Sequence, residues 1–488
     1  MIKKEVRALL PAWSACALAI IASRWQVRPV GGLTVPAYVI GTAGLGAWAV
    51  GHEYAHGTLT SLLTLPVPRG RSWATKLAVL APMLAGLSAL GMLLFVRSNG
   101  DQEFGVALFI LPALAALFVA PWLTMETRSP LAGAVFTIGA LGGSLAAGEW
   151  IGELRYGFTG QVDAFRLAFL WWAMGGLATL GAVMGWRRFA SLETLDGHST
   201  DVQLPTSRTR AVTRTRVTRR HPLIRLIAKE LRLQQLSIVV AAVWALAYTI
   251  SEASGARATY QSDFFSSNLP SVLTVFYTLV LPIVIGSLPC AEERQLGTLD
   301  AQLLLPGRSS TQWVVKSATA FSLTVILALV LPLALARILG DAGWLFVPGT
   351  GNRLPAELVV SVLAITSISL YVSTIARSGM WALIWSVGAV IASGVVVSEL
   401  LNLGIGRKVF AAVHAARAPH PHLQFMALRD VYVLVPLCGF AVLAVALALP
   451  HYRYAARRPA LIAGHAVIAV AYVMACNVVV NVLWALEY

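Results

Sequence analysis

The chain of 488 residues is 57% hydrophobic and only 12% charged, and its mean hydropathy is +0.73. Soluble domains carry about 25% charged residues, so this composition excludes a soluble globular enzyme. The net charge is +15, but the basic residues lie between apolar blocks, where Lys and Arg set the orientation in a membrane. We therefore expect membrane lipid, and no nucleic acid, as the surroundings of this protein.

Apolar runs of about 20 residues, each long enough to cross a hydrocarbon core of about 30 Å, recur along the whole chain. The first six lie near residues 8–23, 35–51, 73–95, 104–125, 130–148 and 164–186. The next six lie near 234–251, 269–290, 313–337, 356–375, 380–402 and 430–449, and one more follows at 460–485. The pattern predicts an all-α polytopic membrane protein of two tandem six-helix units in parallel orientation, with one extra C-terminal membrane helix.

The N-terminus has the basic start and apolar middle of a secretory signal, but no convincing small-residue cleavage site follows. We expect it to be a retained first membrane helix. Four cysteines lie in or beside apolar blocks, and none is paired at CxxC spacing: Cys16, Cys290, Cys438 and Cys476. Neither a disulfide framework nor a zinc knuckle is predicted.

The predicted organisation is a first unit at 1–190, a basic linker at 191–222, a second unit at 223–458 and the extra helix at 459–488. The linker composition cannot bury a core, so we expect a solvated cytoplasmic segment that attracts anionic lipid. Because six spans precede it, the N-terminus is also expected in the cytoplasm, with a bacterial plasma membrane as the expected location. When the spans are counted from the cytoplasmic N-terminus, the loop 403–429 falls on the external side of the membrane, although its basic residues are typical of a cytoplasmic loop.

A segment that begins at Gly51 recurs from Cys290 without a gap. The offset of 240 superposes Glu53 on Glu293, Gly57 on Gly297, Thr58 on Thr298, Leu59 on Leu299, Leu63 on Leu303, Leu65 on Leu305, Pro66 on Pro306, Trp73 on Trp313 and Lys76 on Lys316. A weaker echo opens each half, where KEVR at residues 4–7 matches KELR at 229–232. The repeat indicates a duplicated unit, and the even number of spans makes the two copies parallel.

Each copy of the repeated segment predicts an elbow at the membrane surface. A Glu ends one membrane helix, a Gly suits the left-handed position after it, and a Thr can cap a new helix. The leucines that follow have the spacing of a short amphipathic helix at the interface, which a proline ends. Trp73 and Trp313 are then expected in aromatic belts, and Lys76 and Lys316 are expected to snorkel to the headgroups.

The Glu of each elbow should have a partner, because burying an unpaired carboxylate at a membrane is costly. The candidates are the basic residues of the helices that open each half. Glu53 would pair with Lys4 or Arg7, and Glu293 would pair with Lys229 or Arg232. Such pairs would join the entry helix and the elbow into one rigid lever.

These segments resemble the membrane permeases of type 2 ATP-binding-cassette (ABC) exporters, in which E-x-x-x-G-T-L, a short coupling helix, Pro and Lys join the second and third helices. The resemblance is strongest over 53–76 and 293–316, and KEVR and KELR resemble the family's connecting helix. It implies that two cytoplasmic ATPase subunits dock on 54–72 and 294–312, and that ATP and Mg are bound by these partners. The coupling residues it implies are Glu53, Gly57, Thr58, Leu59, Pro66, Lys76, Glu293, Gly297, Thr298, Leu299, Pro306 and Lys316.

On this resemblance the chain is a transport subunit, not an enzyme, and it carries no cofactor of its own. The sequence contains no G-x-x-x-x-G-K-[ST], so we expect no ATP bound by a Walker loop. The apolar spans predict a hydrophobic or amphipathic substrate, such as a drug, an antibiotic or a lipid. His465, Asn477 and Asn481 inside the last run are interpreted as polar contacts between helices.

Two other functions compete with this prediction. A secondary transporter with two halves would also have parallel repeats, but it should carry ionisable groups deep in its spans, which are nearly free of charge here. His52, Glu53 and His56 form HExxH, the zinc motif of metallopeptidases, and residues 195–197 spell LDG. The second copy keeps Glu293 but has Glu292 and Leu296 in place of the histidines, so we predict no metal site.

Overall fold

The computed structural model describes residues 2–24, 34–55, 58, 67–99, 102–156, 161–191, 222–253, 269–299, 308–339, 356–402, 437–452 and 459–486. Within these residues the regular structure is helical, and no strand occurs. The linker between the two sets of helices, the loop 403–429 and most of each predicted coupling helix lie outside the described residues.

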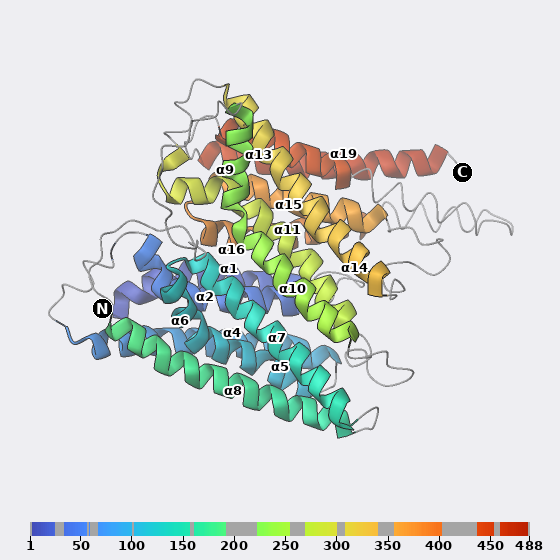
Figure 1. The fold of residues 1–488 in the computed structure, drawn as a ribbon. Helices are drawn as coiled ribbons and strands as arrows, with labels where there is room; N and C mark the ends of the chain where they lie inside the picture. Colours follow the sequence, from blue (N-terminus) through green and yellow to red (C-terminus); the bar gives the residue numbers. More distant parts are fainter. Residues whose placement is uncertain are drawn as a thin grey trace, which may run out of the picture.

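Six helical segments form the first part of the chain (Figure 1). They are α1 (Ile2–Arg24), α2 (Thr34–Ala55), α4 (Arg69–Asn99), the continuous α5 (Gln102–Leu114), η2 (Ala115–Val119) and α6 (Ala120–Thr127), then α7 (Pro130–Tyr156) and α8 (Gln161–Ala190). Each covers one of the first six predicted spans, because long apolar runs bounded by Gly, Pro or charge are a strong local signal.

The second part begins with a short amphipathic helix, α9 (Pro222–Leu233), which meets α10 at an angle of 55°. The segments that follow are α10 (Gln235–Ala253), α11 (Leu269–Gln295), the continuous α13 (Ser309–Thr324), η3 (Val325–Val330) and α14 (Leu331–Leu339), α15 (Ala356–Ile375), α16 (Gly379–Asn402), an apolar helix at Leu437–Tyr452, and α19 (Pro459–Leu486). Residues 437–449 of the predicted run at 430–449 lie in this helix, and residues 430–436 lie outside the described residues.

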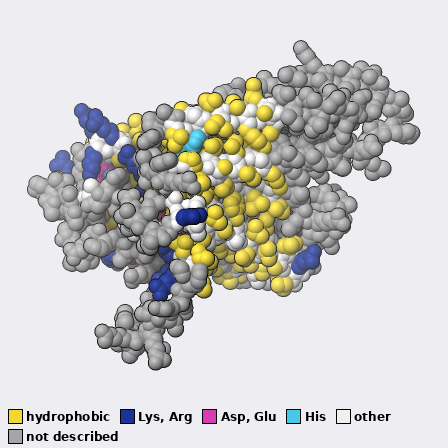
Figure 2. Space-filling view, turned by 90° about the horizontal axis from the view of Figure 1, so that it is seen from above, with side chains coloured by type: hydrophobic (Ala, Val, Ile, Leu, Met, Phe, Trp, Pro, Cys, Tyr) yellow, Lys and Arg dark blue, Asp and Glu magenta, His cyan; other side chains and the backbone are white. Residues whose placement is uncertain are grey.

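Among the described helices, eight are long and apolar enough to cross a membrane, or nine if the bent pair α9 and α10 is counted as one span. Figure 2 shows a broad surface of hydrophobic side chains, with most of the Lys and Arg side chains in view gathered toward one end. The chain is therefore an α-helical protein built to lie in a membrane. The full count of thirteen spans stays a prediction, since α2, α16, Leu437–Tyr452 and α19 are not among the eight.

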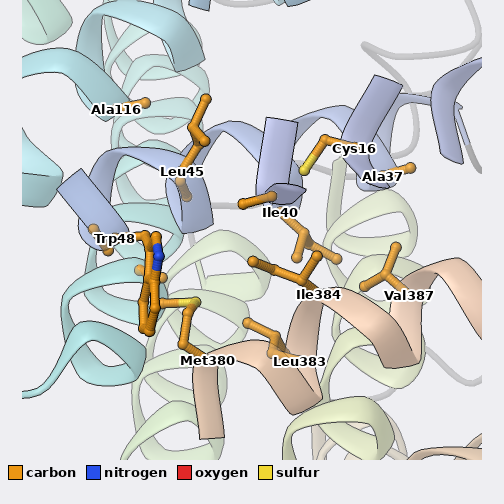
Figure 3. Close-up of a cluster of buried hydrophobic side chains, with 14 of the residues drawn as sticks. Cys16, Ala37, Ile40, Leu45, Trp48, Ala116, Met380, Leu383, Ile384 and Val387 are labelled. Atoms are coloured by element: carbon orange, nitrogen blue, oxygen red, sulfur yellow. The ribbon is translucent and has the colours of Figure 1, made fainter. Parts of the chain in front are cut away.

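Two central helices organise the packing. In the first part, α2 contacts α1, α4, α6 and α7, and in the second part α11 contacts α10, α13, α15 and α16. Across the two parts, α1 packs on α16, and α7 packs on α10. Figure 3 shows Ile40 and Trp48 of α2 on the side of Met380 and Leu383 of α16, in a core drawn from both parts.

Glycines let helices approach closely at the π-helical turn η2. A Cβ on Gly46 of α2 would lie 2.0 Å from the carbonyl oxygen of Ala116, and a Cβ on Gly181 of α8 would lie 2.9 Å from the backbone of Phe118. Gly139 of α7, in contrast, has nothing within 4 Å of the position that its Cβ would take. Close backbone approach therefore fixes η2 between α2 and α8.

We expect Gly46→Ala to destabilise the protein by about 1 to 3 kcal/mol, because a backbone oxygen cannot move aside as a flexible side chain can. Gly139→Ala is the matched control, since both positions share the gain of about 0.5 to 1 kcal/mol in helix propensity. Thermal unfolding in detergent, followed by tryptophan fluorescence, should show a lower midpoint only for Gly46→Ala. Equal midpoints for the two variants would contradict this account of η2.

Candidate functional site

A buried cluster of charges lies where α2 ends and α4 begins. The ammonium of Lys76 in α4 lies 3.1 Å from both carboxylate oxygens of Glu5 in α1, and 3.4 Å from Glu53 at the end of α2. It also donates a hydrogen bond of 3.1 Å to the carbonyl oxygen of Ala49. Lys76 is only 1% exposed, and both carboxylates are fully buried, so these groups interact without intervening solvent.

Other groups complete the partners of Glu53. Lys4, which is half exposed, lies 3.2 Å from Oε1 of Glu53. The hydroxyl of Thr58 donates a hydrogen bond to Oε2, and the Thr58 amide donates to the Glu53 carbonyl oxygen at 3.0 Å. His52 lies 3.2 Å from the same carboxylate through Nε2, while its Nδ1 is 3.0 Å from the carbonyl oxygen of Trp48. The elbow at the end of α2 is thus tied back to its own helix and to α1.

The second part of the chain contains the same arrangement. The ammonium of Lys316 in α13 lies 2.7 Å from Glu230 in α9 and 2.7 Å from Glu293 at the end of α11. It donates to the carbonyl oxygen of Pro289 at 3.2 Å, and Lys229 lies 2.5 Å from Glu293. Lys316 is 1% exposed, like its counterpart. A buried lysine therefore joins three helices in each part of the chain.

The two clusters are built from residues at equivalent positions of the two copies. Ala49 and Pro289, Glu53 and Glu293, Thr58 and Thr298, and Lys76 and Lys316 are each separated by 240 residues. Lys4 and Lys229, and Glu5 and Glu230, are separated by 225. The repeated segment and the weaker KEVR and KELR echo are thus two components of one duplicated ion cluster.

Several sequence predictions can be compared with this geometry. Lys4 and Lys229 form the expected ion pairs, whereas Arg7 and Arg232 are exposed on α1 and α9. Gly297 has a φ of +68°, the left-handed conformation expected after the helix. Gly57, Leu59, Pro66 and Pro306 lie outside the described residues, and Leu299 is buried beside Trp313.

Two predictions were wrong. Lys76 and Lys316 do not snorkel to the headgroups, because two carboxylates in each cluster hold their ammonium groups in the interior. Trp73 and Trp313 do not form an aromatic belt: both are buried, Trp73 against Phe189 and Trp313 against Tyr452. The role of Glu5 and Glu230 was missed, although their recurrence beside Lys4 and Lys229 before each first span was a usable signal.

Opposite charges balance within each cluster. Glu53 lies beyond the predicted span 35–51. Burial alone would raise the pKa of its carboxyl group. The hydrogen bond with His52 and the positive charge of Lys76 outweigh this effect and hold the pKa well below its usual value. The second cluster lacks this imidazole, because Glu292 stands where the first has His52. The carboxylate of Glu292 lies beside the start of α16. A Cβ added to Gly379 would lie 3.3 Å from Oε2 of Glu292.

The residues of the HExxH motif do not fit a zinc site. Glu5, His52 and Glu53 each bring one potential ligand atom into a group no more than 4.8 Å wide. The ammonium of Lys76 already contacts both carboxylates, so a built-in cation neutralises the charge that a metal ion would meet. His56, the second histidine of the motif, lies outside the described residues.

An entirely apolar cavity lies between the two parts, bounded by α2, α11, α15 and α16. Ile40 and Val280, which are 240 residues apart, face it from α2 and α11. Val387 and Ile365 contribute from α16 and α15. The cavity thus includes equivalent positions of the two central helices.

Comparison of the chain with protein-family profiles, with curated proteins and with solved structures found no match. Its function therefore has to be inferred from the duplicated ion cluster, the helix packing and the apolar cavity.

We expect Lys76→Met and Lys316→Met each to destabilise the protein by about 3 to 5 kcal/mol, because each leaves two buried carboxylates without their cation. Lys4→Met is the control: its side chain is 54% exposed, and removal of so exposed a charge should cost less than about 1 kcal/mol. Thermal unfolding midpoints of the three variants test this ranking. A midpoint of Lys76→Met close to that of Lys4→Met would contradict it.

We also predict that the purified protein contains no stoichiometric zinc. Elemental analysis after growth with added zinc should find well below one ion per chain, and a chelator should leave the unfolding midpoint unchanged. His52→Ala combined with His56→Ala should not alter the metal content. One tightly bound zinc per chain, lost in that double variant, would reinstate the metallopeptidase hypothesis.

Proposed function

We propose that the chain is a fused permease of an ABC exporter, in which two six-helix units are driven by separate cytoplasmic ATPase subunits. The observation that carries this proposal is the duplicated ion cluster at the base of each repeated elbow, with Lys76 and Lys316 at its centre. The ATPase subunits would dock on 54–72 and 294–312, directly beyond the two clusters.

The clusters suit the transmission of force. In each part, one lysine connects the entry helix, the end of the second span and the start of the third, through Glu5 and Glu53 or through Glu230 and Glu293. A displacement of the elbow would therefore move three helices together. Coupling of ATP binding to a change of the membrane helices requires such a stiff connection.

The packing between the two parts supports two fused units. The first span of one part packs on the fifth span of the other in both directions, as α1 on α16 and α10 on α7. Reciprocal contacts of this kind are the signature of a two-fold interface between equivalent subunits. A single chain with this packing corresponds to a permease dimer joined by a linker.

The substrate in this proposal is hydrophobic or amphipathic, such as a drug, an antibiotic or a lipid. The interface between the units is lined only by apolar side chains of α2, α11, α15 and α16, and the cavity there measures about 30 Å³, so the apolar lining and not a preformed binding space supports this substrate class. Without a polar partner this lining would penalise a charged group, because unpaired charges are costly in an apolar interior.

The same observations disfavour a secondary transporter. Ion-coupled transport needs ionisable groups along the pathway. Three buried histidines that the structure describes, His52, His451 and His465, lie away from the cavity lining, and the buried Glu and Lys residues that it describes are Glu5, Glu53, Lys76, Glu230, Glu293 and Lys316. All six belong to the two clusters at the helix ends, and within the described residues no carboxylate lines the cavity.

Reconstitution with the soluble ATPase encoded beside the gene, if there is one, tests the proposal directly. The chain alone should not hydrolyse ATP, and it should form a complex with the ATPase that does. Deletion of residues 58–66 together with the equivalent residues 298–306 should abolish this complex while leaving the chain in the membrane. ATP hydrolysis by the single chain, or a complex that survives the deletion, would overturn the assignment.

Glu53→Gln and Glu293→Gln should uncouple ATP hydrolysis from transport in that complex. Each variant weakens the bond between Lys76 or Lys316 and its elbow, so that the ATPase can turn over without moving the spans. Glu126→Gln, which removes an exposed carboxylate paired with Arg188, is the control. Transport per ATP should fall several-fold in the first two variants only, and parental coupling in both would show that the elbow is merely a turn.

A further inference from the structure

A second polar cluster, independent of the elbows, holds the extra C-terminal helix. His465 of α19 lies with Nδ1 3.2 Å from the hydroxyl of Tyr371 in α15. Its ring is edge-on to that of His451, at the end of the helix 437–452, with 4.9 Å between the ring centroids. Both imidazoles are buried, so two titratable groups from two helices meet inside the protein.

The surroundings of this pair favour neutral imidazoles. Nε2 of His451 is buried and has no hydrogen-bond partner. The charges that act on His451 are those of His465 and of Arg294 in α11. Arg294 donates hydrogen bonds of 2.8 Å to the carbonyl oxygens of Thr374 and Ala376, which hold its guanidinium in place. No carboxylate among the described residues is positioned to offset a positive charge on either histidine.

α19 also contacts α16. Its outer face exposes Val467, Val470 and Met474. Further along α19, the ring of Tyr472 packs against Gly439. A Cβ added to Gly439 would lie 1.8 Å from the phenol oxygen of Tyr472. At the inner end of the helix, His465 supplies a polar contact between α19 and α15.

We propose that His451 and His465 form a proton-operated lock, which docks α19 on the second unit at neutral pH and releases it on acidification. At neutral pH the two imidazoles are uncharged, and one hydrogen bond joins His465 to Tyr371. When each imidazole takes up a proton from solvent, two like charges face each other beside Arg294, and Nε2 of His451 carries a proton without an acceptor. Undocking of α19 exposes both cations to water and headgroups.

The site lies at the end of the molecule that carries the second ion cluster. Tyr452, the neighbour of His451, donates a hydrogen bond of 3.0 Å to Gln312 at the start of α13, the helix of Lys316. If the proposed orientation in the membrane holds, the lock responds to cytoplasmic pH. The lock itself does not depend on the proposed transport function.

The test measures the distance between α19 and the helix 437–452 in the full-length protein in lipid nanodiscs. Spin labels are placed at Val442→Cys and Val467→Cys, both exposed positions, after Cys438→Ser and Cys476→Ser, while the buried Cys16 and Cys290 remain. Pulsed electron paramagnetic resonance at pH 8 and pH 5.5 brackets the ordinary histidine pKa of about 6.5. We expect one distance at pH 8 and a second, longer population at pH 5.5.

Variants identify the groups responsible. His465→Phe keeps a ring at this position but cannot titrate, so its distance distribution should be the same at both pH values; His451→Phe provides a second such variant if the first fails to fold. His414→Gln, which replaces a histidine of the loop 403–429, should behave like the parent. An unchanged distribution in the parent at pH 5.5, or an equal change in both phenylalanine variants, would overturn the proposal.

Discussion

The structure depends on the burial of one ammonium group between two carboxylates at the end of each central helix. An isolated buried charge costs several kcal/mol, so Lys76 is stable in the interior only because Glu5 and Glu53 surround it, and each carboxylate is stable only because of the lysine. The three side chains come from three helices. Because each charge needs the opposite charge within a few ångströms, the cluster fixes the positions of α1, α2 and α4 relative to one another. Apolar contacts are non-directional and would allow the helices to shift along one another.

The sequence allows the helices to be predicted well and the ion cluster only in part. Apolar runs are local signals, so the predicted spans coincide with helices within the residues that the structure describes, and residues 430–436 of one span lie outside them. The repeat at an offset of 240 indicated that Glu53 and Glu293 need partners, and Lys4 and Lys229 are among them. The central role of Lys76 was not predictable by the same means, because its partner Glu5 belongs to an echo with a different offset, and a lysine near a membrane surface ordinarily snorkels. Which charges meet is decided by tertiary packing.

The two copies of the cluster differ where their neighbours differ. In the first, His52 adds a third potential cation beside Glu53. In the second, Glu292 replaces it and lies beside the start of α16, while Arg294, which stands at the position of Tyr54, binds the carbonyl oxygens that end α15. The second elbow is thus fastened to the corner between α15 and α16. The lysine and its two carboxylates are common to both copies. The contacts of His52, Glu292 and Arg294 are each found in only one copy.

The connection between each cluster and its first span also differs. In the first part the entry segment is continuous with the span, since α1 runs from Ile2 to Arg24 and contains Pro11. In the second part the chain bends by 55° between α9 and α10, and the side chain of Gln234 fixes this bend through a hydrogen bond of 2.9 Å to the carbonyl oxygen of Ile285. Because α1 packs on α16 of the other part, a movement of the first cluster reaches both parts through one continuous helix. In the second part the bend separates the entry helix α9 from the first span α10, so two chemically similar clusters are connected to their first spans in different ways.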